Sequence, residues 1–106
     1  MIKAQYFEKV LPMFYAYMLR CADSSLYTGY TVNIKKRLAA HNSGTASKYT
    51  RVRLPVALAY LEAYPSKHEA MQRECALKRL KKEEKEQLVS GFEAGPLPAS
   101  PLGGPC

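Results

Sequence analysis

Two short apolar and aromatic runs, separated by a polar turn, form the clearest pattern in this chain. The run 14–21 is apolar at successive positions, which predicts a strand buried on both faces. Residues 22–25 have the composition of a turn, and residues 26–30 predict a second strand that returns beside the first. A third run, 56–64, follows a proline and predicts a third strand.

A helix is expected between the second and third strands. Either Thr31 or Asn33 can cap its N-terminus, and the helical pattern continues to about Asn42. Gly44 then occupies the position where a left-handed residue commonly ends a helix. The segment 44–53 is polar and basic, and it is expected to be a loop.

Two further helices are expected after the third strand. Ser66 followed by Glu69 is a capping-box pattern, and it predicts a helix from this point to about Leu80. A break at 81–82 and a short final helix to about Val89 complete the order β-β-α-β-α-α. This order predicts a small α+β domain built on a three-stranded antiparallel sheet with flanking helices.

The expected domain occupies residues 13–92. Residues 1–12 are expected to form a weakly ordered extension, and Met13 is an alternative start codon. Residues 93–106 are rich in proline and glycine without periodicity, which predicts a disordered tail.

Charge and composition narrow the class of partner. The chain has 106 residues, and its 16 basic against 9 acidic residues give a net charge of +7. So basic a domain favours a polyanionic partner, most simply nucleic acid, although an ordinary solvated surface is the alternative. No apolar run has the length of a membrane span, and three widely spaced cysteines match neither a disulfide framework nor a zinc site. Reduced thiols and a cytoplasmic location are therefore expected.

The first helix carries an arginine and a histidine beside its apolar stripe. With 100° per residue, His41 lies roughly 20° and Arg37 roughly 60° from Ile34. Because Arg37 and His41 are four residues apart, their side chains share one face. Two interpretations are open: the pair reaches into a cleft beside the sheet, or the arginine extends past apolar neighbours to water.

A glutamate lies within the apolar arc of the second helix. Glu74 is roughly 40° from Ala70 on the helical wheel, and a carboxylate buried there needs a partner. Lys78 at i+4 is one partner, and a hard cation such as Mg²⁺ is the other. In the basic loop, lysine and arginine alternate with a tyrosine, a composition suited to phosphate contact and base stacking. The loop residues expected to bind nucleic acid are Lys48, Tyr49, Arg51 and Arg53.

These motifs, taken in order, resemble a known family. The triplets at 15–17 and 27–29, followed by Arg37, His41 and Glu74, are similar to the GIY-YIG nuclease superfamily. The chain looks most like its small stand-alone bacterial members, through the segments LYTGYT, KYTRVRLP and EAMQRECALKRLKK. It also resembles the N-terminal nuclease domain found in the repair excinuclease.

The resemblance implies a Mg²⁺-dependent or Mn²⁺-dependent nuclease that hydrolyses phosphodiester bonds in DNA. Its implied catalytic residues are Tyr17, Tyr27, Arg37 and His41, and its implied metal ligand is Glu74. In these roles the arginine binds the phosphate, and the tyrosines and histidine orient or deprotonate the attacking water.

This chain also departs from the family pattern. Tyr30 stands where some relatives have lysine, and Tyr15-Ala16 replaces the glycine and isoleucine of the first triplet. Two other functions therefore stay open beside the nuclease. The main one is a catalytically weak nucleic-acid-binding module of the same fold, and the second is an adaptor that docks another protein on its sheet.

Overall fold

Seven helices and strands follow one another along residues 13–92, the part of the chain that the computed structural model describes. They are β1 (Phe14–Arg20), β2 (Leu26–Thr31), α2 (Ile34–Asn42), α3 (Lys48–Arg51), β3 (Ala57–Tyr64), α4 (Lys67–Arg79) and α5 (Lys82–Ser90). This order confirms the predicted α+β class and adds α3. The expectations for residues 1–12 and 93–106 lie outside the described part of the chain.

The three strands form one antiparallel sheet in the order β2-β1-β3. Because β1 has a neighbour on each side, it is the central strand, and its five inner residues are buried, as its continuous apolar run predicted. The register places Tyr17 of β1 opposite Gly29 of β2 and Leu61 of β3. β2 is an edge strand, so one of its sides is open.

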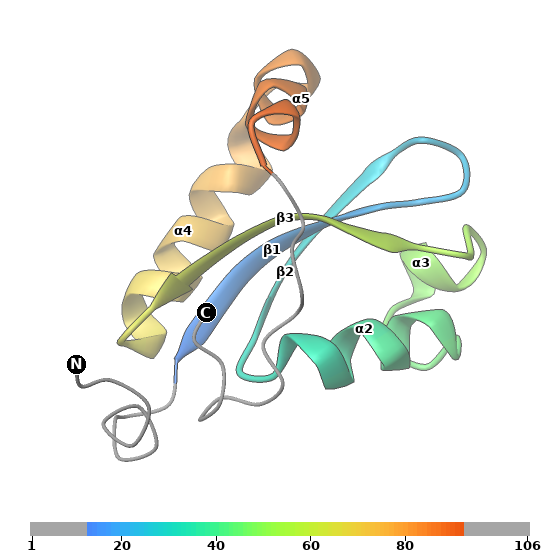
Figure 1. Ribbon diagram of the computed structural model, residues 1–106, viewed down its shortest axis with the longest axis horizontal. Coiled ribbons are helices and arrows are strands. Elements are labelled where there is room, and N and C mark those ends of the chain that lie inside the picture. Colours follow the sequence, from blue (N-terminus) through green and yellow to red (C-terminus); the bar gives the residue numbers. More distant parts are fainter. Residues whose placement is uncertain (1–12, 93–106) are drawn as a thin grey trace.

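Alternate residues of β1 supply two separate cores (Figure 1). Tyr17 and Leu19 point to the face covered by α2, where they pack with Ile34. Ala16 and Met18 point to the opposite face, where they pack under Leu77 of α4 and apolar residues of α5. The sheet is therefore the middle layer, with α2 and α3 on one side and α4 and α5 on the other.

The two main helices begin and end at residues that the sequence marks. The Asn33 side chain accepts a hydrogen bond from the backbone N–H of Lys36, which selects it as the cap of α2. Gly44 after α2 has a φ of +84°, in the left-handed region that glycine tolerates. The Ser66 hydroxyl accepts the N–H of Glu69 at the start of α4. Within residues 13–92 no helix has the length and apolar character needed to cross a bilayer.

The segment predicted to be a loop contains the four-residue helix α3, and here the prediction was wrong. Ser47 caps α3 by accepting the backbone N–H of Thr50 at 3.0 Å. A single turn is too short to show the periodicity by which longer helices are recognised. This turn matters to the site, because it directs Thr50 into the interior while Lys48 and Arg51 stay exposed.

Two arginine–carboxylate pairs fasten the helices to the sheet. Arg20 of β1 donates two hydrogen bonds to the carboxylate of Glu86 in α5, at 2.5 and 2.6 Å. Arg73 of α4 donates two to Glu62 of β3, at 2.8 and 3.1 Å. Paired donors of this kind fix orientation as well as distance, so α4 and α5 are held at a defined position over their face of the sheet.

Candidate active site

The buried phenol of Tyr17 lies at the centre of the predicted site. Its Oη is 2.9 Å from Nε2 of His41, and both side chains are almost fully buried. The ring crosses directly over Gly29 on the neighbouring strand. A Cβ at Gly29 would be 2.5 Å from Tyr17 Oη, so only glycine leaves room for the ring in this position.

Replacing Gly29 by alanine should therefore destabilise the fold by about 1–3 kcal/mol, the usual cost of overpacking a filled interior. The added methyl group would push the Tyr17 ring away and break its bond to His41. Urea unfolding followed by circular dichroism measures the loss.

Gly91→Ala is the matched control, because a Cβ there would be 3.8 Å from its nearest neighbour, the Leu88 carbonyl oxygen. A Gly29→Ala variant as stable as Gly91→Ala would contradict the tight approach of the Tyr17 ring.

Four of the predicted site residues interact electrostatically. Burial raises the pKa of Tyr17 well above its ordinary value, so the side chain is a neutral phenol at physiological pH. Tyr27 and Glu74 raise this pKa further, while the positive charge of Arg37 lowers it. Residues from β1, β2, α2 and α4 therefore influence one buried phenol.

His41 is fully buried on the inner face of α2. It therefore lies deeper than the helical wheel predicts, which places it beside the apolar stripe. Its ring bridges Tyr17 and Thr50, with Nδ1 2.8 Å from Thr50 Oγ1. Burial, and secondarily the charge of Arg37, lowers the pKa of His41 below its ordinary value. The imidazole is therefore neutral at physiological pH, with one nitrogen as donor and the other as acceptor.

Tyr27 connects this buried pair to the basic segment. Its ring centroid is 5.1 Å from that of His41 and 5.9 Å from that of Tyr49, on which it stacks. The guanidinium of Arg53 lies 3.8 Å above the Tyr49 ring and also bonds to Asp23. Of the four predicted loop residues, Tyr49 thus contacts Tyr27 and Arg53 contacts Tyr49. Lys48 and Arg51 lie exposed on α3.

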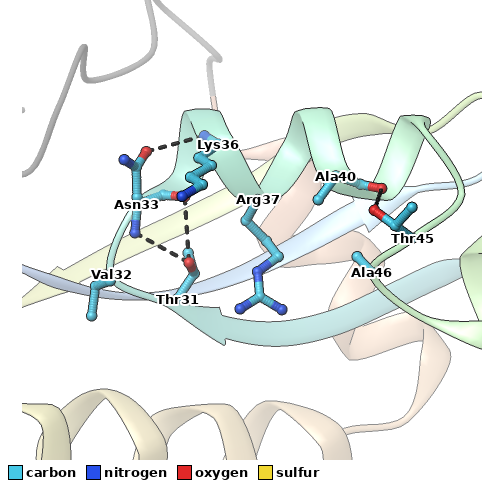
Figure 2. A pocket seen from close by; sticks show the side chains of 8 residues that line it. All are labelled: Thr31, Val32, Asn33, Lys36, Arg37, Ala40, Thr45 and Ala46. Atoms are coloured by element: carbon cyan, nitrogen blue, oxygen red, sulfur yellow. Dashed lines mark hydrogen bonds between the residues drawn. The ribbon is translucent and has the colours of Figure 1, made fainter.

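Arg37 occupies an open cavity of about 400 Å³ beside α2. The lining residues are Thr31, Val32, Asn33, Lys36, Arg37, Ala40, Thr45 and Ala46. Figure 2 shows the Arg37 side chain leaving α2 with its guanidinium apart from the hydrogen-bonded pairs around it. The guanidinium is therefore free of the neighbours drawn there and available to an anion.

Glu74 is half-buried and ion-paired, which confirms Lys78 as a partner of its carboxylate. Its Oε2 is 3.1 Å from Nζ of Lys78, as the i, i+4 spacing predicted. The carboxylate side chain is 21% exposed and the lysine side chain 56%, so the lysine can move aside into solvent. Within residues 13–92 no three histidine, cysteine or acidic side chains gather at one point. A site with fewer than three such side chains suits a hydrated hard cation and not zinc.

The sequence missed three contributors to the site. Thr50 and Ser47 form a hydrogen-bond chain behind His41, and a threonine in a polar loop carries no signal for that role. Lys85 of α5 lines a second cavity of about 270 Å³ together with Tyr27, Tyr49 and Lys78. Only the packing of α5 against the sheet brings this lysine near β2.

Comparison with known proteins identifies relatives of this chain. A UPF0213 protein of Streptococcus pneumoniae serotype 4 is 53% identical over 76 residues, which cover 72% of this chain and 77% of that protein. A UPF0213 protein of Natronomonas pharaonis is 51% identical over 76 residues, covering 72% and 89% of the two chains. A protein of E. faecalis, solved by NMR in solution, is 38% identical with a TM-score of 0.51, covering 77% of this chain and 88% of that one. A family model described as the GIY-YIG catalytic domain matches residues 13–87, and the chain therefore belongs to the GIY-YIG family.

Proposed function

We propose that this protein is a metal-dependent nuclease that hydrolyses phosphodiester bonds in DNA. The observation that carries the proposal is the Tyr17–His41 hydrogen bond with the Tyr27 ring against it. The charges of Arg37 and Glu74, which come from two further elements, act on the same Tyr17 phenol. A cation-binding carboxylate, an open guanidinium and polar aromatic rings are the groups that phosphodiester hydrolysis uses.

Arg37 is the proposed phosphate-binding residue. A guanidinium offers donors in a fork that matches two phosphate oxygens. The exposed position of Arg37 in an open cavity supports this role, since a DNA backbone needs access from solvent. Its fixed positive charge would stabilise the negative charge that develops on the phosphate oxygens during attack.

Glu74 is the proposed ligand for Mg²⁺ or Mn²⁺. Such a cation commonly takes one or two carboxylates and keeps several waters, which fits the donor set around Glu74. When bound, the ion polarises the phosphate and stabilises the leaving oxygen. Without a bound cation, the ion pair with Lys78 neutralises the half-buried carboxylate of Glu74. The solvent-exposed lysine can move away and release this carboxylate to the cation.

Tyr27 is the proposed residue that orients the attacking water, with Tyr17 and His41 behind it. Tyr27 lines the second cavity, which it shares with Tyr49 and Lys85, and its ring is in edge contact with the neutral His41 ring. Tyr17 is too buried to ionise readily, so we assign it a hydrogen-bonding role. The exposed Lys48 and Arg51, together with the Tyr49–Arg53 stack, would bind the DNA backbone along α3.

The test is incubation of the purified full chain with plasmid, single-stranded, flap and branched DNA, in the presence of Mg²⁺, Mn²⁺ or EDTA. The expected result is cleavage of at least one DNA with either metal and none with EDTA. RNA of matched sequence measures whether the substrate class extends to the other nucleic acid.

A second function is favoured by one observation, the ion pair that occupies Glu74. If Lys78 held this carboxylate permanently, the domain would bind nucleic acid without cutting it. Salt-sensitive DNA binding with no cleavage under any metal would replace the nuclease by this binding module. A protein that neither binds nor cleaves DNA would instead favour the adaptor.

A further inference from the structure

We propose that Thr50 is a positioning residue that holds His41 in the Nδ1–H tautomer and thereby keeps Nε2 as the acceptor of the Tyr17 hydroxyl proton. The catalytic meaning of this assignment rests on the proposed function, whereas the tautomer itself does not. Thr50 is not among the residues to which the family resemblance assigns a role.

A continuous hydrogen-bond chain carries the proposal. It runs from Tyr17 Oη to His41 Nε2 at 2.9 Å, from His41 Nδ1 to Thr50 Oγ1 at 2.8 Å, and from there to Ser47 Oγ at 3.0 Å. Tyr17, His41 and Thr50 are 1%, 0% and 0% exposed. Ser47, at the other end, is only half-buried. The chain therefore extends from the interior to the surface at α3.

Two proton arrangements satisfy these distances, and they differ in what they leave unpaired. If His41 donates through Nε2 to Tyr17, the Tyr17 hydroxyl proton is left in the interior, and no other hydrogen bond to Tyr17 is found within residues 13–92. If every proton instead points outward, Tyr17 donates to His41, His41 to Thr50 and Thr50 to Ser47. The leftover proton then belongs to the half-buried Ser47, where water can accept it. Because buried donors are almost always paired, the outward arrangement is the stable one.

The outward arrangement decides what Tyr17 offers to the site. With its proton directed to His41, the phenol oxygen presents lone pairs on its other side. The phenol oxygen can therefore act only as an acceptor toward the site, and it donates no hydrogen bond to the phosphate. Thr50 sets the direction of the Tyr17–His41 hydrogen bond, because its oxygen is the acceptor that the Nδ1–H group of His41 needs.

Nitrogen-15 NMR of the His41 ring in the full chain tests the proposal. The wild type should show Nδ1 protonated and Nε2 with a free lone pair. In Thr50→Val, which keeps the shape and removes the hydroxyl, the Nδ1–H tautomer should be lost in favour of Nε2–H. Thr50→Ser should restore the wild-type tautomer, and Thr45→Val, at an exposed threonine near α2, should leave it unchanged.

Either of two results would overturn the assignment: an Nε2–H tautomer in the wild type, or an unchanged tautomer in Thr50→Val. The wild-type and Thr50→Ser spectra decide the matter even if Thr50→Val does not fold. Cleavage by Thr50→Val should fall about 10- to 100-fold, as when a hydrogen-bond partner behind a functional side chain is removed. A wild type that cleaves no DNA would refute the proposed function, and the tautomer measurement would stand apart from it.

Discussion

Replacing Glu74 by glutamine should abolish metal-dependent cleavage of DNA, with a rate loss of at least about 100-fold, the order expected when a group that stabilises transition-state charge is removed. The amide is nearly the same size but lacks the charge that holds a hard cation. Only a partly exposed i, i+4 ion pair with Lys78 is lost, worth about 0.5 kcal/mol or less, so the fold should persist. Cleavage rates across a Mg²⁺ titration, with Mn²⁺ binding measured by calorimetry, give both effects.

Glu69→Gln is the control for this prediction, because Glu69 is exposed in the first turn of the same helix and is not among the charged residues that act on Tyr17. It should retain wild-type cleavage and Mn²⁺ affinity. If Glu74→Gln cut DNA at the wild-type rate, Glu74 would be only the partner of Lys78, and the proposed metal site would be refuted.

Arg37→Ala should lower cleavage by a similar factor, at least about 100-fold, while leaving the free energy of unfolding within about 0.5 kcal/mol of wild type. The side chain is exposed in its cavity and bonded to none of the residues drawn around it, so its removal disturbs little packing. Arg37→Lys should recover part of the activity, since lysine keeps the charge and loses the two-pronged geometry.

Lys35→Ala provides the matched comparison, because Lys35 is an exposed base on the same helix but does not line the Arg37 cavity. It should weaken DNA binding slightly and leave the cleavage of bound DNA unchanged. Equal losses of cleavage in Arg37→Ala and Lys35→Ala would reduce Arg37 to part of a general basic surface.

Most of the fold could be predicted because its strands and helices are marked by residues that are close together in the sequence. The apolar run of β1 needed no knowledge of its partners, and the caps at Asn33, Gly44 and Ser66 act within one turn of their helices. α3 escaped prediction because one helical turn has no period to detect. Its contribution became visible only when Thr50 was placed against His41.

The candidate site was only partly readable along the chain. Helical spacing placed His41 and Arg37 on one face of α2, yet they have different environments, one fully buried and the other exposed. Spacing also paired Glu74 with Lys78, but it could not measure how much of each side chain meets solvent. That difference decides whether the lysine can release the carboxylate.

By itself, the sequence determined the order of strands and helices and the approximate ends of the main helices, because these depend on short-range periodicity and backbone chemistry. The tertiary structure alone decided that Gly29 must lack a side chain under the Tyr17 ring, that Lys85 approaches β2, and that Thr50 stands behind His41. Each of these depends on contacts between elements distant in sequence, whose distances are set by how the two faces of the sheet are packed.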